Sequence, residues 1–287
     1  MNTPEQIPIG LVPDMPAEVY HAINAMSAGG LKRMAQSPAH FFGLQLDPER
    51  PAAGEPTDAL RFGTLFHTAL FEPATLAERY VVKPGGKEGD GRTKEGAAWK
   101  AANADRIIID AAELATVQRM AANVLALPEV GSLMANGIAE ASAFWIDELT
   151  GELCKCRPDF VAEAGDGVIL VDGKSTQDAR PEPFARSIWN LDYHLQAAWY
   201  SDGYEQATGK KVHGFVFAAA EKAWPCAAAA YMLGDDVLDK ARAENRRLLN
   251  LYAECKRTGV WPGYPPGVQL IELPKWARMM RKRWADA

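Results

Sequence analysis

The sequence predicts an α/β protein with a central mixed β-sheet flanked by helices and an additional, mainly helical N-terminal part. Three observations predict this fold class. From residue 140 onward, apolar and polar residues alternate with the period of two that strands require. Residues 168–172 (VILVD) form a short apolar run that is typical of a strand buried on both faces. Residues 26–136 instead contain segments with helix-capping residues and helical apolar spacing.

The length and composition are those of an ordinary globular chain. At 287 residues it can bury a full-sized core in one large domain or two smaller ones, and we expect a single domain over 1–287. We divide it into a mainly helical part at 26–136, a sheet core at 137–233 and C-terminal helices at 234–287. No apolar run is long enough to cross a bilayer and the first residues lack a secretion pattern, so we expect a cytoplasmic protein without membrane contact.

The charge balance argues mildly against a protein that binds nucleic acid indiscriminately. The formal net charge is -6, whereas such proteins usually carry a positive excess; local basic patches can still override the total. Cys154 and Cys156 form a C-x-C pair and Cys226 and Cys255 stand alone, which is not the spacing of a zinc site. We therefore expect free thiols in a reducing compartment.

Capping residues predict the helices of the N-terminal part. Ser27 is a good N-cap for a helix over residues 28–36, and Pro38 suits the first turn of the next helix. Residues 47–56 contain three prolines and a glycine and should form a surface loop. Asp58 is the expected cap of the helix that follows this loop.

The helix over residues 59–71 is apolar on nearly all sides and should be buried. His67 lies on the same face as Gly63, one turn earlier. One interpretation of His67 is a hydrogen-bonded core histidine. The other is a functional histidine, which Gly63 would favour by letting another group come close.

Residues 83–96 are glycine-rich, charged and without periodicity, so we expect a mobile loop there. Its basic residues include Arg92 and Lys94. Such a loop is either a solvated surface segment or a flap that contacts phosphates.

The alternating segment predicts a hairpin with strands over residues 142–146 and 153–161. On the second strand, Lys155, Arg157 and Asp159 would all point to one side. A strand with one charged face in an α/β protein either turns that face to solvent or lines a site with it.

The buried strand ends in Asp172, which is followed by Gly173 and Lys174. Asp172 and Lys174 share a side because they are two residues apart, and Gly173 leaves its carbonyl open to a ligand. A carboxylate at the end of a buried strand must be hydrogen-bonded, ion-paired or bound to metal. Two outcomes stay open: an ion pair of Asp172 with Lys174 or Arg157, or a site where Asp159 joins Asp172 and Lys174 to hold a divalent cation and a phosphate.

A helix over residues 191–208 follows and presents one polar stripe, made by Asp192, Gln196 and Tyr200. Two further strands and a long charged helix complete the folded part. The tail interleaves tryptophans with Arg278, Arg281 and Lys282. This pattern suits phosphate binding with stacking, and equally a surface helix or one that docks on a neighbouring subunit.

These residues, in this order, resemble the active-site pattern of the PD-(D/E)xK nuclease superfamily. RPD at 157–159 matches the first acid, DGK at 172–174 the second acid and the lysine, and QAAWY at 196–200 the Q-x-x-x-Y helix of the exonuclease branch. More closely, the chain is similar to the nuclease domain of the phage-type RecE exonucleases (exonuclease VIII). The similar segments are SAGGLKRMAQSPAHF, GTLFHTALFEP, RTKEGAAW, the run from residue 140 to RPDF, VDGKS and QAAWY.

The resemblance implies a role for each matching residue. The metal ligands would be His67, Asp159, Asp172 and the Gly173 carbonyl oxygen. Lys174 would be the catalytic lysine, and the site would be completed by Glu140, Gln196 and Tyr200. The glycine in the middle of D-x-K departs from the larger residue common there, but it removes no side-chain ligand. DNA contacts are expected from Arg157, Arg92, Lys94, Arg278, Arg281 and Lys282.

The ion expected at such a site is Mg²⁺, which prefers about six oxygen ligands and keeps several waters. A histidine ligand leaves room for Mn²⁺. One or two ions per site would fit, with Glu140 as a candidate ligand for the second.

The resemblance also implies a function. We expect an exonuclease that degrades linear double-stranded DNA from the 5′ end, leaves 3′ single strands and works beside a single-strand-annealing protein in phage-type recombination. The resemblance further implies a ring-shaped homo-oligomer in the cytoplasm of a bacterial host. The gene would belong to the host or to a prophage. The alternatives are a PD-(D/E)xK endonuclease or nickase of repair or restriction, and a catalytically inactive DNA-binding module. An iron–sulfur nuclease is disfavoured because the cysteines lack a cluster pattern.

Overall fold

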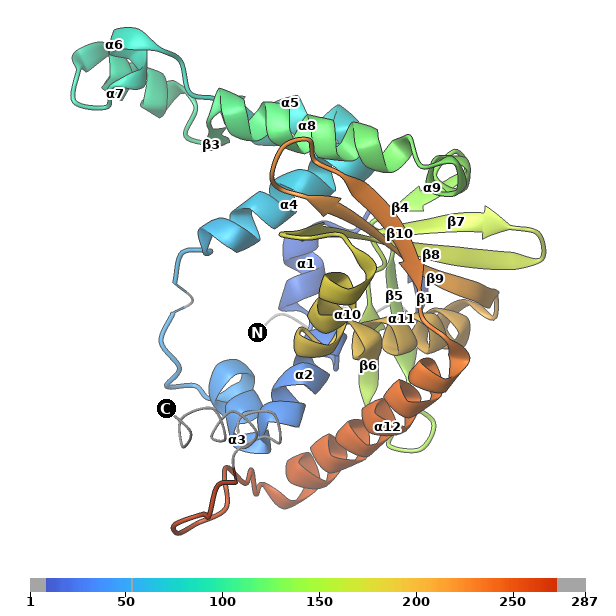
Figure 1. Ribbon diagram of the computed structural model, residues 1–287. Helices are drawn as coiled ribbons and strands as arrows, with labels where there is room; N and C mark the ends of the chain where they lie inside the picture. Colours follow the sequence, from blue (N-terminus) through green and yellow to red (C-terminus); the bar gives the residue numbers. More distant parts are fainter. Residues whose placement is uncertain (1–8, 53, 273–287) are drawn as a thin grey trace, which may run out of the picture.

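The computed structural model describes residues 9–52 and 54–272 and confirms the α/β fold class. Its main sheet has the strand order β10-β9-β8-β7-β4. Strands β8 and β9 are parallel and the other neighbours are antiparallel, so the sheet is mixed as predicted. The five strands, shown in Figure 1, are β4 (Gly137–Ala139), β7 (Phe160–Ala164), β8 (Gly167–Thr176), β9 (Lys211–Glu221) and β10 (Ala228–Met232).

A second, antiparallel sheet has the order β1-β5-β6. Its strands are β1 (Gly10–Val12), β5 (Ser142–Ile146) and β6 (Leu153–Cys156). β5 and β6 form the predicted hairpin, and Gly151 in its turn has a φ of 72°, a conformation that glycine adopts without strain. Two short parallel strands, β2 (Tyr80–Val82) and β3 (Ile107–Ile109), stand apart from both sheets.

The N-terminal part is mainly helical, as expected. Its helices are α1 (Ala17–Ala22), α2 (Ala28–Gln36), α3 (Pro38–Phe41), a π-helical turn (Phe42–Leu46), α4 (Asp58–Phe71), a 3₁₀ turn (Pro73–Thr75), α5 (Leu76–Arg79), α6 (Gly86–Gly89), α7 (Lys94–Ala102), α8 (Ala111–Leu125) and α9 (Pro128–Leu133). The hydroxyl of Ser27 accepts a hydrogen bond from the Gly30 amide at 3.2 Å and caps α2 as predicted. Helix α4 is capped by Thr57 instead of Asp58, which is its first residue.

Three further helices come later in the chain, after β8. They are α10 (Pro181–Asn190), α11 (Tyr193–Thr208) and α12 (Asp235–Thr258). Gly209 and Gly259 end α11 and α12 with φ values of 70° and 71°, where a left-handed residue closes the last turn. Helix α12 has Gly234 as its N-cap residue, and Asp235 lies in its first turn.

Apolar side chains cover both faces of the main sheet. Helices α4 and α8 pack on one face, against Val171 and Val216. Helices α10 and α11 pack on the other face, against Leu170 and Phe217. Neighbouring residues of β8 thus serve opposite layers, because side chains alternate along a strand.

A third apolar cluster joins α11 to α2, α12 and the β5–β6 hairpin through Leu31, Trp145, Trp199 and Leu248. Burying each such side chain stabilises the fold by about 1.5–3 kcal/mol. Helix α11 is therefore covered on two sides, by the sheet and by α12 (Figure 1).

The prediction of one continuous strand with a charged face over residues 153–161 is wrong. β6 ends at Cys156 in one sheet and β7 begins at Phe160 in the other. Lys155 is only 5% exposed, and its ammonium donates to the carbonyl oxygens of Tyr20 and Ile23, each at 2.7 Å. Alternation shows which side chains share a face, but it does not show where a strand leaves its sheet.

The predicted loop over 83–96 also differs, since it contains α6 and the start of α7. The Thr93 hydroxyl accepts a hydrogen bond from the Gly96 amide at 2.9 Å and caps α7. Gly63 does not act as expected either: among the described residues, no atom lies within 4 Å of where its Cβ would stand. The tail residues Arg278, Arg281 and Lys282 lie outside the described part of the chain. None of the helices within that part is long and apolar enough to span a membrane.

Candidate active site

The site is built on β8, in the middle of the main sheet, which continues past Asp172 to Thr176. Asp172 is 1% exposed and points toward the α10–α11 layer, where Gln196 Nε2 donates to its Oδ1 at 2.7 Å. Gly173 faces the opposite layer. A Cβ on Gly173 would lie 2.8 Å from Cε2 of Phe71 on α4, so the glycine lets this helix pack directly on the strand.

Asp159 stands immediately before β7. Phe160 pairs with Val171 in antiparallel register, so Asp159, one residue before β7, lies opposite Asp172. The Asp159 Oδ2 accepts a hydrogen bond from the Gly173 amide at 2.9 Å. Burial and the negative charge of Asp172 raise the pKa of Asp159 well above its usual range. The structure thus brings the two predicted acids together.

His67 reaches this pair from α4. Its Nε2 lies 2.8 Å from the Gly173 carbonyl oxygen, which can only accept, so this nitrogen carries the proton. Its Nδ1 lies 3.3 Å from Asp159 Oδ2. Burial and the nearby Lys174 ammonium lower the pKa of His67, which favours the neutral ring with a lone pair on Nδ1.

A lone pair and a carboxylate oxygen at this distance repel each other unless a cation or a proton lies between them. Ligand atoms of His67, Glu140 and Asp159 all lie within 4.8 Å of one another. One imidazole and two carboxylates fit a divalent cation of the Mg²⁺ or Mn²⁺ type. The residues present therefore form an acidic site into which such an ion fits.

Glu140 is held at this site by its own backbone and by Arg157. Its φ is 51° and its amide donates to the Asp159 carbonyl oxygen at 2.9 Å. Arg157 Nε donates to the Glu140 carboxylate at 2.8 Å, and Arg157 Nη1 donates to Met15 and Ser142. Burial and Asp159 raise the pKa of Glu140 to about 7. Arg157, which was expected to contact DNA, thus donates these hydrogen bonds to groups of the protein itself.

Lys174 forms the predicted ion pair with Asp172 Oδ2. Among the described residues, that buried oxygen accepts no hydrogen bond of regular geometry, so the ammonium contact is electrostatic. Burial alone would lower the pKa of Lys174, but Asp172 and Asp159 outweigh burial and raise it. The two carboxylates therefore favour the charged ammonium. The ion pair lies beside the acidic residues, so it is compatible with the cation site that the sequence left open as the other outcome.

Tyr200 lies one turn after Gln196 on the same face of α11. Burial, Tyr20 and then Asp159 raise its pKa well above the usual range, which favours the neutral phenol. Its ring packs edge-on against Phe215 with centroids 6.4 Å apart.

Sequence reasoning missed two residues beside Lys174, namely Lys32 and Tyr193. Lys32 on α2 donates to the Leu191 carbonyl oxygen at 2.7 Å and lies 5.2 Å from the centre of the Tyr193 ring. Lys174 lies 4.6 Å from the same ring. Burial and Lys174 lower the pKa of Lys32 to about 8. Lys32 belongs to the SAGGLKRMAQ segment that carried part of the resemblance, and this membership was the only indication in the sequence that Lys32 lies at the site.

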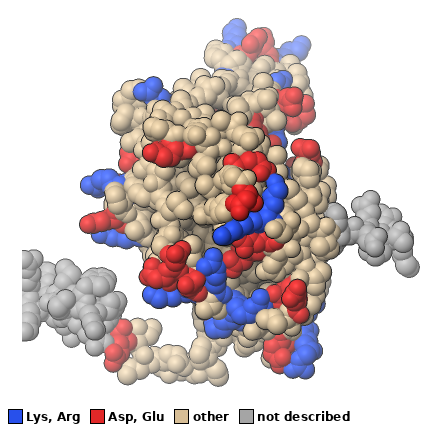
Figure 2. Space-filling view, turned by 90° about the vertical axis from the view of Figure 1, so that its right-hand side faces the viewer, with Lys and Arg blue, Asp and Glu red and all other residues tan. Residues whose placement is uncertain are grey.

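Arg92 and Lys94 are not brought to the site. They lie on the α6–α7 segment, which projects from the far end of α5 and α8 in Figure 1. Arg92 forms an exposed ion pair with Asp90 at 2.9 Å. On the face shown in Figure 2, Lys and Arg side chains are interspersed with Asp and Glu.

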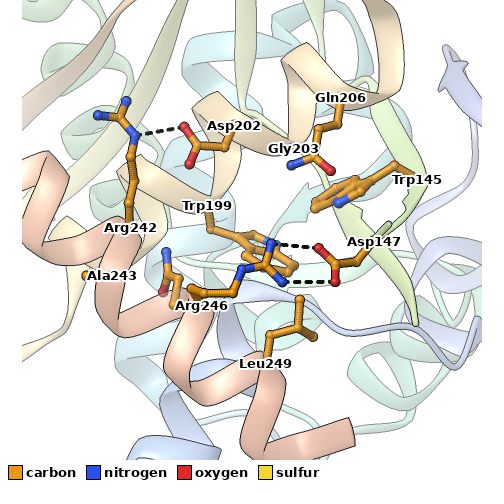
Figure 3. A pocket seen from close by; sticks show the side chains of 11 residues that line it. Trp145, Asp147, Trp199, Asp202, Gly203, Gln206, Arg242, Ala243, Arg246 and Leu249 are labelled. Carbon is orange, nitrogen blue, oxygen red and sulfur yellow. Dashed lines mark hydrogen bonds and ion pairs between the residues drawn. The ribbon is translucent and has the colours of Figure 1, made fainter. Parts of the chain in front are cut away.

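A cavity of about 330 Å³ lies away from these residues, between α11, α12 and β5 (Figure 3). Arg246 crosses it and donates to both oxygens of Asp147, at 2.7 and 2.9 Å. Arg242 donates to Asp202 at 2.9 Å. These ion pairs join α12 to the hairpin and to α11, and none of the predicted site residues lines the cavity.

Comparisons with known proteins agree with this geometry. A family described as "PDDEXK-like domain of unknown function (DUF3799)" matches residues 27–274. No curated protein matches the chain. The crystal structure of a "Putative exonuclease" from Eubacterium rectale is similar at 15% identity, covering 89% of this chain and 97% of that chain with a TM-score of 0.55. A structure of SSO0001 covers 66% of this chain and 85% of that chain at 12% identity, with a TM-score of 0.29 that carries no weight.

Proposed function

Because the chain belongs to the PDDEXK-like family DUF3799, we propose that it is a metal-dependent exonuclease acting on linear double-stranded DNA. The family and the acidic site make the protein a nuclease of the PD-(D/E)xK superfamily. One observation carries the proposal. Asp159, Asp172 and Lys174 meet in the main sheet beside His67 and Glu140, which gives both a cation site and a charged lysine for phosphate.

The cation would be held by His67, Glu140 and Asp159, with Asp172 and the Gly173 carbonyl oxygen as the further ligands that the resemblance implies. Bound there, a divalent ion would supply Lewis-acid neutralisation of charge on the phosphate. Mg²⁺ is the proposed ion, and the imidazole makes Mn²⁺ a workable substitute. Whether one or two ions bind is settled by titration.

The protein's own groups would bind and orient the phosphodiester. Lys174 remains an ammonium, so it stabilises negative charge that grows on the phosphate oxygens during attack. Gln196 fixes the orientation of Asp172 through its hydrogen bond. Arg157 fixes Glu140 in the same way. The neutral Tyr200 phenol can donate to a phosphate oxygen without adding repulsion.

The direction of digestion, 5′ to 3′ with 3′ overhangs left behind, is the part of the proposal that rests on the RecE-like segments. The experiment uses linear duplexes labelled at the 5′ or the 3′ terminus, with covalently closed circular DNA of the same sequence. We expect early release of the 5′ label, a persistent 3′ label, an intact circle, and no reaction with chelator. Cleavage of the circle would instead establish an endonuclease or nickase, and binding without cleavage in Mg²⁺ or Mn²⁺ an inactive module.

The proposed partners follow from this activity. A ring-shaped homo-oligomer with basic residues inside would reconcile a net charge of -6 with a DNA substrate. A single-strand-annealing protein would take up the 3′ strand in the bacterial cytoplasm. Light scattering of the purified protein tests the ring, because a monomer at micromolar concentration would contradict it.

A further inference from the structure

An exposed tryptophan lies four residues before Tyr193, whose ring contacts Lys174. Trp189 lies in the last turn of α10, and 72% of its surface is exposed. Its indole stacks on the His194 imidazole, with centroids 5.1 Å apart and planes 11° apart. His194 Nδ1 lies 3.4 Å from the Ile188 carbonyl oxygen, and this contact helps to hold the imidazole in place. The indole is thus held by an offset stack on the imidazole while most of its surface stays exposed.

The tryptophan is joined to the catalytic lysine through one short segment. Two residues after Trp189, the Leu191 carbonyl oxygen accepts the hydrogen bond from Lys32. Two residues further, the Tyr193 ring lies against both Lys32 and Lys174. The segment from Trp189 to Tyr193 therefore carries an exposed aromatic ring at one end and contacts two ammonium groups at the other, although the Lys174 side chain is only 12% exposed.

Phosphates and bases alternate along a nucleic acid strand in the same manner. Ammonium groups bind the backbone phosphates, and flat aromatic side chains stack with unpaired bases of any sequence. A base inside an intact duplex has both faces covered by its neighbours, so only an unpaired or terminal base can use such a surface.

We propose that Trp189, supported by His194, is a stacking platform for an unpaired nucleobase of the strand whose phosphate lies at Lys174. This inference deepens the proposed function and names its substrate more closely, as a DNA end with separated terminal bases. Lys32 binds a phosphate of the same strand. The platform favours the opened end and so lowers the cost of bringing one strand to the acids.

Binding is measured in chelator, where no cleavage occurs, by fluorescence anisotropy of a 5′-labelled single-stranded 12-mer of deoxythymidine. Trp189→Ala should weaken binding about tenfold, the range expected for one lost base–aromatic stack. Trp189→Phe should recover most of the affinity, because it keeps an aromatic plane. The matched control is Trp224→Ala, which removes a tryptophan that is 78% exposed on the β9–β10 turn and should change nothing.

A second measurement compares cleavage rates in Mg²⁺ of a blunt duplex and one with four unpaired nucleotides at its end. Trp189→Ala should slow the blunt substrate more than the frayed one, since the frayed end is already open. Equal binding by wild type and Trp189→Ala overturns the platform and leaves the nuclease proposal intact. Trp189-dependent binding without any cleavage by wild type supports the platform and overturns the nuclease proposal. A changed oligomeric state of Trp189→Ala with unchanged DNA affinity assigns the tryptophan to a subunit contact and also overturns the platform.

Discussion

The Nε2 atom of His67 lies 2.8 Å from the carbonyl oxygen of Gly173, a residue 106 positions later in the chain. This hydrogen bond fixes the tautomer of the histidine and turns its other nitrogen toward Asp159. It forms only because α4 lies directly on β8. The packing of one helix on one glycine thus sets the direction of a predicted metal ligand.

Replacing Gly173 by alanine should therefore disturb both the fold and the site. The new Cβ would lie 2.8 Å from Cε2 and 3.2 Å from Cζ of Phe71, and 3.4 Å from a methyl group of Leu70. Such overpacking costs about 1–3 kcal/mol. We expect this loss in urea unfolding, together with weaker metal binding because α4 moves away. The control is Gly63→Ala in the same helix, which has open space and should gain up to about 1 kcal/mol. Equal stability of Gly173→Ala and wild type would contradict the contact.

Asp172→Asn should fold but lose nearly all nuclease activity. The amide keeps a partner for Gln196, whereas the negative charge that Lys174 and a cation require is gone. We expect the cleavage rate of a linear duplex in Mg²⁺ to fall by about 10²-fold or more, since a missing charge in such a site typically costs that much. Asp166→Asn, at an exposed carboxylate paired with His213, is the control and should cleave normally. Wild-type digestion by Asp172→Asn would disprove the assignment of this acid.

Lys174→Met should impair the chemical step more than DNA binding. The ammonium acts on charge that grows during the reaction, so its loss should lower the single-turnover rate by about 10²–10³-fold. The affinity for an uncleaved duplex in chelator should change far less, because Lys32 remains. Equal losses in rate and affinity would give Lys174 a binding role alone.

His67→Ala and Glu140→Gln should each weaken metal binding. Each removes one of the ligand atoms that lie within 4.8 Å of one another at the site. Calorimetric titration with Mn²⁺ should show affinity lowered by at least about tenfold, the effect typical even of changes that only reorient a ligand. The control is Glu163→Gln. Glu163 lies on β7, and its exposed carboxylate pairs with Lys210. Unaltered Mn²⁺ affinity in both variants would place the ion elsewhere.

Arg246→Ala should destabilise the fold in a pH-dependent way. The Asp147 side chain is only 3% exposed, and burial alone would raise its pKa, but hydrogen bonds from Arg246 and Thr150 outweigh burial and lower it. At pH 7, removing the arginine leaves a buried charge unpaired and should cost about 2–3 kcal/mol, less than a fully buried pair because Arg246 is partly exposed.

A depressed folded pKa contributes stability above the unfolded value of about 3.9, and this contribution is lost as the pH falls through the folded pKa. The difference between wild type and Arg246→Ala should therefore shrink below about pH 4. Urea unfolding at pH 7 and pH 3 measures it. The matched variant is Arg257→Ala, whose exposed pair with Glu254 should contribute little at either pH. A constant difference would mean that the pair does not stabilise through charge.

Local patterns in the sequence predicted that Asp159 and Asp172 lie together, whereas His67 was expected beside them only from the resemblance. Asp159 and Asp172 are 13 residues apart on strands joined by a tight turn, so alternation and the hairpin brought them together correctly. Lys155 and Arg157 were placed on the same face by the same rule, yet the chain changes sheets between them and Phe160. Arg157 then turns inward to Glu140.

The contribution of Lys32 had no local signal in the sequence. A lysine on an amphipathic helix normally points to water, and only the fold shows that α2 brings it to the Leu191 carbonyl oxygen. The helices over 83–96 were missed because glycines and charges without periodicity conceal short capped helices. Helices of this length draw their stability from caps and contacts more than from propensity.

The position of α11 between the main sheet and α12 bears on protein synthesis. The ribosome delivers His67 first, the acids later and Gln196 after them, while α12, which completes the packing of α11, emerges last. A nascent chain therefore holds its acids without the helix that orients Asp172. Until α12 has been made, α11 lacks one of the two surfaces that it packs against, so the hydrogen bond from Gln196 to Asp172 is not yet supported from both sides.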